Sequence, residues 1–190
     1  MYFTETMVWQ AEKCFGVPKT IRLNYPTPQV NFDFIRSTQK NDRAHDITLY
    51  FYHDQRLAVT RKPMYPKGAY RPSSGGLNPG ETLEQAAARE GWEEMGVTVT
   101  IRDYLLRARV DFIFRDDRIR WTTHVFRVVW EGTGEPTLKP QDTREICEAV
   151  WATEAEFLGP MQHALLSTDS TGLLYRTHLH DYIWRTFGWG

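Results

Sequence analysis

The sequence of 190 residues has little cysteine: Cys14 and Cys147 are its only two, far apart and outside any CxxC spacing. This spacing excludes a zinc site of the cysteine-cluster type. Without a disulfide pattern, we expect two reduced and buried thiols and a cytoplasmic protein.

Long apolar runs are also missing. No stretch approaches the roughly 18 apolar residues that indicate a membrane-spanning helix. Residues 1–6 have neither the basic start nor the apolar core of a signal peptide. We therefore expect no membrane partner.

Charge of one sign is not in excess, because 23 Lys and Arg face 24 Asp and Glu, for a net charge of −1. General nucleic-acid binders usually carry a basic surplus, so nucleic acid is not the expected partner. Walker motifs, nucleophile elbows and internal repeats are absent as well. The length suffices for one domain with a full core and terminal additions.

What the sequence does contain is apolar–polar alternation that predicts strands. The strands that we expect are 30–35, 47–52, 56–60, 106–114, 119–130 and 150–151. The tail from residue 154 reads as helical, with breaks near 159–160 and 167–172. Together these elements predict an α+β fold built on a mixed or antiparallel sheet.

One helix has clear boundaries in the sequence. It should begin with a capping box at Thr82 and Gln85 and end before Gly96, which suits the left-handed residue after a helix. Its buried stripe would be Leu83, Ala87, Gly91 and Met95. The glutamates of this helix lie off that stripe, and we expect them to face solvent or a cleft.

Glu90, Glu93 and Glu94 share one face of this helix, because residues three and four apart are neighbours on a helix. Three carboxylates on one face repel one another unless a cation lies among them. Negative charge near the C-terminus of a helix also opposes the helix dipole, which argues against a merely solvated acidic end. Following a glycine-rich loop at 75–80, the pattern predicts a metal site for an anionic substrate.

The spacing within residues 75–97 closely resembles the Nudix box, G-x5-E-x7-R-E-U-x-E-E-x-G-U, in which U is aliphatic. The matching residues are Gly75, Glu81, Arg89, Glu90, Glu93, Glu94, Gly96 and Val97. The resemblance implies a Nudix-type αβα sandwich around a mixed β-sheet. It also implies hydrolysis of a pyrophosphate bond in a nucleoside diphosphate linked to another moiety, with Mg²⁺ or Mn²⁺ as cofactor.

The resemblance also assigns roles to residues. By position in the box, the catalytic residues would be Arg89, Glu90, Glu93 and Glu94. The metal ligands would be Glu90, Glu93, Glu94 and, from a segment that matches the family more loosely, Glu145. Glu148 and Glu135 are the alternatives to Glu145. For each of the three, the competing interpretation is an ordinary surface glutamate with no role in metal binding.

Substrate contacts would come from Gly75 and Gly76 of the glycine-rich loop. Arg107 and Arg109 on one strand face could grip phosphates as bidentate donors, although solvated surface arginines are the alternative. Tyr65, Tyr70 and Trp121 are candidate base-stacking surfaces, with core or rim packing as the competing interpretation.

The box departs from the family pattern at two places that bear on substrate. Gly91 stands at an aliphatic position, where a glycine in a helix costs about 1 kcal/mol relative to alanine. We expect close packing against a bulky neighbour to compensate, with Trp92 covering the gap. Asn78 stands where many members have a glutamate, which removes one possible metal ligand.

The predicted organisation is an N-terminal extension at 1–44, partly packed on the core, and a Nudix hydrolase domain at 45–190 that ends in a helical segment. The expected partner is a small-molecule nucleotide, and a homodimer is possible. A non-catalytic nucleotide-sensing or interaction domain and an RNA 5′-end pyrophosphohydrolase are the alternatives. Phe112 and Ile113 stand where ADP-ribose hydrolases have a proline, and the motif of NADH hydrolases is missing after Val97.

Overall fold

The computed structural model describes residues 3–39 and 43–189, and at its centre is a mixed seven-stranded sheet. The strands follow the order β1-β5-β6-β2-β3-β7, and β4 pairs with β2. Strands β1/β5 and β2/β6 are parallel, and the other pairs are antiparallel. The bounds are β1 Lys19–Pro26, β2 His45–His53, β3 Arg56–Arg61, β4 Ser73–Gly75, β5 Thr100–Phe114, β6 Asp117–Val129 and β7 Glu148–Ala152.

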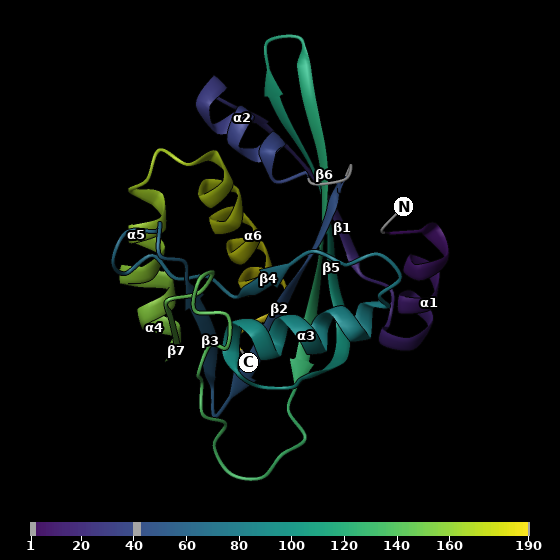
Figure 1. Cartoon of the computed structure of the whole chain (residues 1–190), viewed down its shortest axis with the longest axis vertical. Coiled ribbons are helices and arrows are strands. Elements are labelled where there is room, and N and C mark those ends of the chain that lie inside the picture. The colour runs from purple at the N-terminus through teal and green to yellow at the C-terminus, as the bar shows by residue number, and fades with distance from the viewer. Residues whose placement is uncertain (1–2, 40–42, 190) are drawn as a thin grey trace.

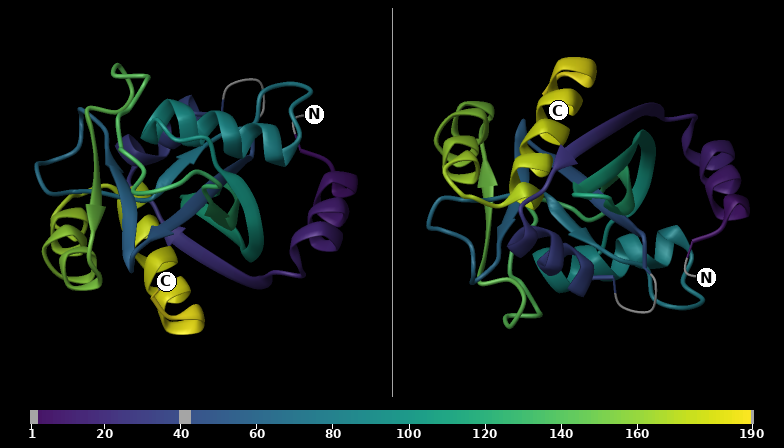
Figure 2. Two further views of the ribbon diagram at one scale, coloured as in Figure 1. Left: turned by 90° about the horizontal axis from the view of Figure 1, so that it is seen from below. Right: turned by 90° about the horizontal axis from the view of Figure 1, so that it is seen from above.

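Helices cover both faces of the sheet (Figure 1), and the end views show α3 and α6 on opposite sides of it (Figure 2). A short π-helical turn, Phe157–Met161, joins α4 to α5. The helices are α1 Glu5–Phe15, α2 Gln29–Ser37, α3 Leu83–Met95, α4 Glu154–Glu156, α5 Gln162–Leu166 and α6 Thr171–Phe187. The α+β class and the αβα sandwich that the sequence predicts are confirmed.

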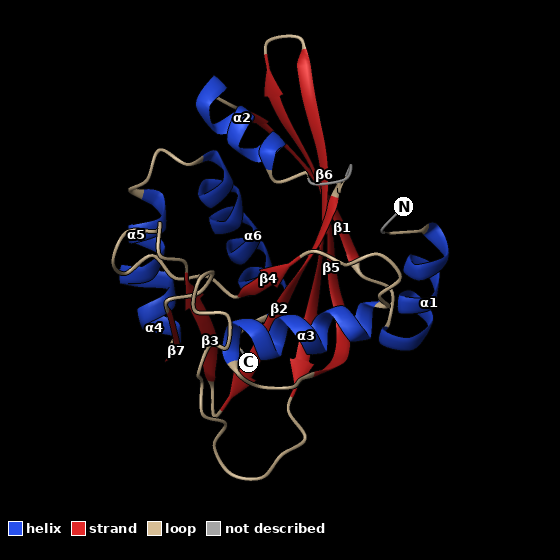
Figure 3. Cartoon of the chain, in the orientation of Figure 1, coloured by secondary structure: helices blue, strands red, loops and turns tan. Residues whose placement is uncertain are grey.

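Strand β2 shows why the core has two halves. Successive strand residues point to opposite faces, so Leu49 and Phe51 pack with α1 and α3. Tyr50, between them, packs on the other face with Leu179 and Ile183 of α6. The predicted strands at 47–52, 56–60, 106–114, 119–130 and 150–151 are all present, and the long β5–β6 hairpin is prominent in Figure 3.

Helix α3 has the predicted ends. Thr82 and Gln85 form both hydrogen bonds of a capping box, and Gly96 adopts the left-handed conformation with φ 74°. The stripe of Leu83, Ala87, Gly91 and Met95 is buried as predicted. The expectation for the glutamates holds only in part, because Glu90 and Glu94 are buried as well, at 6% and 2% exposure.

Gly91 is explained by the turn that follows the helix. A Cβ at this position would lie 2.8 Å from the Val97 carbonyl oxygen and 2.8 Å from Val99 Cγ2. The sequence predicts a bulky neighbour at this position, and the structure identifies it as Val99. Trp92 does not cover the gap, since it is 50% exposed.

Replacing Gly91 by alanine should destabilise the protein by about 1–2 kcal/mol, because overpacking of about 1–3 kcal/mol outweighs the gain in helix propensity. Leucine at this position should cost more. Gly159→Ala is the control, since nothing lies within 4 Å of its added Cβ. Urea unfolding of the three variants measures the effect, and a Gly91→Ala variant more stable than wild type would contradict the packing explanation.

Two local predictions are wrong. Residues 30–35 belong to α2, not to a strand, because the alternating apolar residues serve two helix faces: Phe32 and Ile35 are buried while Phe34 is exposed. Cys14 and Cys147 are free, as expected, but both are exposed rather than buried.

The C-terminal tail is helical, but the expected break at 159–160 is wrong. Pro160 lies inside the π-helical turn, so the chain continues directly into α5. A break does occur between α5 and α6, as predicted. Among the described residues, no helix combines the length and the apolarity that crossing a membrane requires.

Candidate active site

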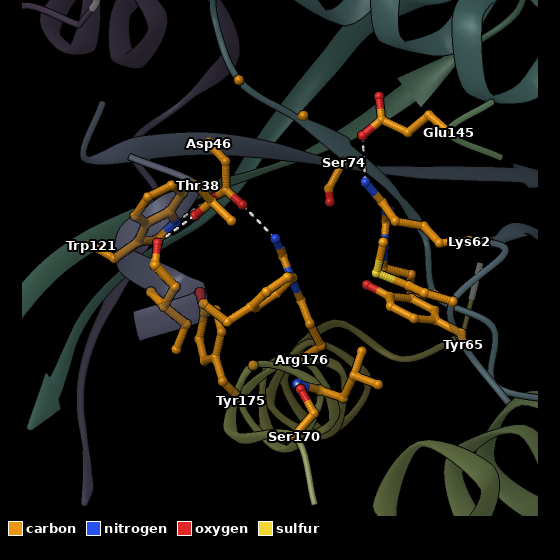
Figure 4. Close-up of a pocket in the computed structure, with 18 of the residues that line it drawn as sticks. Thr38, Asp46, Lys62, Tyr65, Ser74, Trp121, Glu145, Ser170, Tyr175 and Arg176 are labelled. Atoms are coloured by element: carbon orange, nitrogen blue, oxygen red, sulfur yellow. Dashed lines mark hydrogen bonds and ion pairs between the residues drawn. The ribbon is translucent and has the colours of Figure 1, made fainter. Parts of the chain in front are cut away.

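A cavity of about 930 Å³ lies beside the C-terminal half of α3. Arg89, Glu90 and Glu93 of α3 line one side of it, together with Gly75 and Gly76. Residues of α2 and the first turns of α6 line the other side. Figure 4 shows Ser74, Lys62 and Glu145 across the cavity from Trp121, Tyr175 and Arg176.

Arg89 organises the carboxylates of α3. Its Nε and Nη2 donate to both oxygens of Glu81, at 2.6 Å and 2.9 Å. Its Nη1 donates to Glu90 Oε1 at 2.7 Å and to Glu93 Oε2 at 2.9 Å. Nη2 also donates to the Gly76 carbonyl oxygen at 2.7 Å, which ties the helix to the glycine-rich loop. One guanidinium therefore orients three of the box glutamates.

Glu90 lies directly against Gly75. A Cβ at Gly75 would be 1.9 Å from Glu90 Oε1, so the carboxylate occupies space that only glycine leaves open. Burial, followed by the negative charge of Glu94, raises the pKa of Glu90 to about 7. A cation in the cavity would favour the charged form of this carboxyl group.

Replacing Gly75 by alanine should lower activity about 100-fold, the order of loss that a misplacement of about 1 Å causes at a reacting centre. The reason is that the new methyl group displaces the Glu90 carboxylate. Because this carboxylate is the flexible end of its side chain, it can move without disturbing the fold. Gly172→Ala is the matched control, because it lines the same cavity and its Cβ meets only Ser170 Oγ at 3.7 Å. Equal activity of the two variants, measured as kcat/KM, would contradict this role of Gly75.

Glu94 takes a different direction from Glu90 and Glu93. It forms a buried ion pair with Arg71, with Nη2 and Oε1 3.2 Å apart and both side chains 3% exposed. Glu94 Oε2 also accepts from the backbone N–H of Ser74 at 3.0 Å. The structure thus brings Glu90 and Glu93 to the cavity and places Glu94 behind them, where it joins α3 to strand β4.

The donor chemistry of the site suits a hard divalent cation, whose preferred ligands are carboxylate oxygens. Glu90 Oε2 and Glu93 Oε1 accept no hydrogen bond from any described residue, and both side chains line the cavity. In the part of the chain that the structure describes, no group of three or more His, Cys, Asp or Glu side chains is already arranged as a metal site. Two open oxygens on adjacent turns of α3 therefore fit part of the ligand set that such a cation prefers.

Glu145 lies on the same cavity and forms an ion pair with Lys62. Burial raises the pKa of Glu145, but the hydrogen bond from Lys62 together with the positive charges of Lys62 and Arg71 lowers the pKa overall. The two alternatives to Glu145 are elsewhere. Glu148 accepts hydrogen bonds from Arg61 and Tyr70, and Glu135 pairs with Arg56.

The structure does not bring the predicted strand arginines to this cavity. Arg107 pairs with Glu12 of α1, with the two charged groups 3.4 Å apart, and Arg109 is exposed on the same strand. Of the candidate stacking residues, Tyr65 and Trp121 line the cavity. Tyr70 does not, and it donates to Glu148 instead.

Four residues of the site carried no signal in the sequence. Arg43 places its guanidinium over Gly76, where an added Cβ would lie 2.1 Å from Nη1. Asp46 and Arg176 form an ion pair in the cavity floor, and Asp46 also accepts from Trp121 Nε1 at 3.0 Å. Arg71 is the fourth. All four depend on contacts between segments far apart in the chain, which spacing within one segment does not reveal.

A family model described as the NUDIX domain matches residues 40–170, more than half of the chain. Two curated proteins match shorter segments. The NAD-capped RNA hydrolase NudC of Chromobacterium violaceum is 46% identical over 43 residues, and the NAD-capped RNA hydrolase of Schizosaccharomyces pombe is 44% identical over 54 residues. These matches cover 23% and 28% of this chain and only 16% and 14% of the relatives' lengths.

Solved structures also resemble the chain. The E. coli ORF135 protein has a TM-score of 0.48 and 16% identity, over 75% of this chain and 90% of that one. A NUDIX hydrolase from Nitrosomonas europaea has a TM-score of 0.48 and 17% identity, over 72% of this chain and 89% of that one.

Proposed function

The chain belongs to the NUDIX hydrolase family, and on this premise we propose that it hydrolyses a pyrophosphate bond in a nucleoside diphosphate linked to a second organic group. One observation carries the proposal: Arg89 holds Glu81, Glu90 and Glu93 together at the edge of a large cavity. The family resemblance implies this chemistry, and the arrangement of the side chains supports it.

Glu90 and Glu93 would hold Mg²⁺ or Mn²⁺ through their open oxygens, with Glu145 approaching from the other side of the cavity. A divalent cation bound there supplies positive charge to the substrate phosphates and makes a water molecule more acidic. Arg89 keeps the two carboxylates in place. Glu94 belongs to the same acidic set, but its role would be structural, because it attaches α3 to Arg71 and Ser74.

The positive groups near the glutamates suit a substrate with two phosphates. Lys62 lies beside Glu145, and Arg43 lies over Gly76. Guanidinium and ammonium groups bind phosphate oxygens by charge-assisted hydrogen bonds. The phosphates would therefore lie between these cations and the carboxylates of α3.

A second candidate function is hydrolysis of the NAD cap of RNA, because both curated relatives are named for it. It involves the same bond type, a pyrophosphate between two nucleosides, and the same site would act on it. The candidates differ in what extends from the cavity, a small organic group or an RNA chain. Comparing kcat/KM for free NAD and for a short NAD-capped RNA separates them.

The proposed function is tested by incubating the protein with NAD, ADP-ribose and UDP-glucose, with and without Mg²⁺ or Mn²⁺. We expect cleavage to two monophosphates for at least one of them, complete loss with EDTA, and recovery when the metal is restored. Tight nucleotide binding without metal-dependent turnover of any compound, or of NAD-capped RNA, would favour a nucleotide-sensing domain and contradict the proposal.

A further inference from the structure

One side of the cavity comes from segments outside the family match. The NUDIX model covers residues 40–170, whereas Val30, Phe34 and Ile35 of α2 and Leu173 and Tyr175 of α6 lie outside it and line the cavity. We call these five residues the distal wall. The carboxylates of Glu90 and Glu93 belong to the matched part and lie on the side formed by α3.

Helix α2 presents apolar residues in two directions. Phe32 and Ile35 are buried against the sheet, at 2% and 8% exposure. Val30 and Phe34, one helical turn apart, are 75% and 54% exposed and line the cavity. Apolar side chains left open at a cavity that also holds polar groups are typical of a ligand-binding surface.

Two contacts attach α2 of the distal wall to neighbouring segments. Asn31 Nδ2 donates to the Asp169 carbonyl oxygen at 2.8 Å, which joins α2 to the loop before α6. At the other end of α2, Arg36 pairs with Asp117 of β6 at 2.8 Å. Both contacts are exposed, so they place α2 beside the cavity but contribute little to stability.

The distal wall itself offers no positive charge to a phosphate. Among the described cavity residues outside the family match, Arg176 is the only charged one. It is paired with Asp46, whose carboxylate also accepts from Trp121 Nε1 and Thr123 Oγ1. Glu90 and Glu93, where the phosphates would bind through a cation, lie on the side formed by α3, and Arg43 lies next to both Gly76 and Trp121. The phosphates and the distal wall would therefore engage different parts of the substrate.

The size of the cavity agrees with a divided substrate. Pockets for drug-sized ligands measure about 300–1,000 Å³, and this cavity of about 930 Å³ holds considerably more than a pyrophosphate group. Aromatic side chains favour stacked or edge-on contact with planar rings. Phe34 of the distal wall supplies such a surface at 54% exposure, and the ring of Trp121 also lines the cavity.

We propose that the distal wall binds the uncharged nucleobase of the substrate and that Phe34, with Val30, determines specificity for it. This inference rests on the proposed function of the same site. Phe34 acts on binding and takes no part in the bond cleavage at Glu90 and Glu93. The specificity of this chain would then be set by α2 rather than by the family motif.

Isothermal titration with AMP, UMP and ribose 5-phosphate tests the inference without requiring turnover. Wild type should bind at least one nucleotide about tenfold more tightly than ribose 5-phosphate, the order of one base–aromatic stacking contact. Phe34→Ala should lose this preference and leave ribose 5-phosphate binding unchanged. Trp9→Ala is the matched control, because Trp9 is an aromatic residue of similar exposure, 56%, on α1 and off the cavity.

The kinetics give a second readout. With a substrate that wild type cleaves, Phe34→Ala should raise KM about tenfold and keep kcat within about twofold. A kcat loss with unchanged KM, or equal binding of nucleotides and ribose 5-phosphate by wild type, would overturn the inference. If no compound is cleaved but Phe34→Ala still abolishes the nucleotide preference, the proposed function fails and the nucleobase site stands.

Discussion

Replacing Glu93 by glutamine should lower kcat/KM by at least about 100-fold, more than the 10- to 100-fold typical of residues that only support a metal ligand. Glutamine keeps the size of the side chain but removes the charge that Glu93 brings to the cavity. The fold should persist, because the Glu93 side chain is 42% exposed. Initial rates at saturating Mg²⁺, together with the melting temperature, measure both quantities.

Glu84→Gln is the control for this substitution. Glu84 is an exposed carboxylate in the first turn of the same helix, away from the cavity. It should retain wild-type kcat/KM. Similar losses in both variants would mean that general charge on α3, and not a site at Glu93, supports activity.

Removing Arg71 should have the largest effect on stability. Arg71→Met leaves the Glu94 carboxylate buried without its partner, which costs about 3–5 kcal/mol for a buried ion pair. Burial alone would lower the pKa of Arg71, but Glu94, together with Tyr65, raises this pKa well above its usual value. Urea unfolding measures the loss.

Two comparisons decide whether the pair itself is responsible. The double variant Arg71→Met/Glu94→Met should recover most of the loss, because no unpaired charge remains in the interior. Arg61→Met should cost only about 0–1 kcal/mol, since its partner Glu148 is 44% exposed. If Arg71→Met lowers the free energy of unfolding no more than Arg61→Met does, the ion pair with Arg71 does not stabilise the buried Glu94 carboxylate.

The sequence predicts the part of the site that helical periodicity decides. Arg89, Glu90 and Glu93 lie within one and a half turns of α3, so their contacts follow from local spacing. Glu94 shows the limit of that reasoning. Spacing alone puts it beside Glu90, and only the structure shows that its carboxylate pairs with Arg71 from a distant segment and is not among the residues that line the cavity.

Helix α2 shows a second limit. Its apolar residues Val30, Phe32 and Phe34 alternate as in a strand, and the sequence prediction is wrong here for that reason. Phe32 packs on the sheet while Val30 and Phe34 line a cavity. The alternation therefore reflects two different tertiary environments, and neither can be recognised from the local sequence. Trp121 was predictable only as one of several candidate stacking residues, because Asp46 and Arg176, which fix its surroundings, come from other parts of the chain.

If the proposed function is right, the glutamates of α3 support metal-dependent cleavage of a pyrophosphate bond. Phosphorus NMR of a dinucleotide substrate with Mg²⁺ tests it most directly, because the pyrophosphate and monophosphate signals are separate. For wild type, we predict that the pyrophosphate signal is replaced by two monophosphate signals, and that Glu93→Gln or EDTA prevents the change. An unchanged pyrophosphate signal with wild type across the substrate panel, or equal cleavage by Glu93→Gln, would contradict the account.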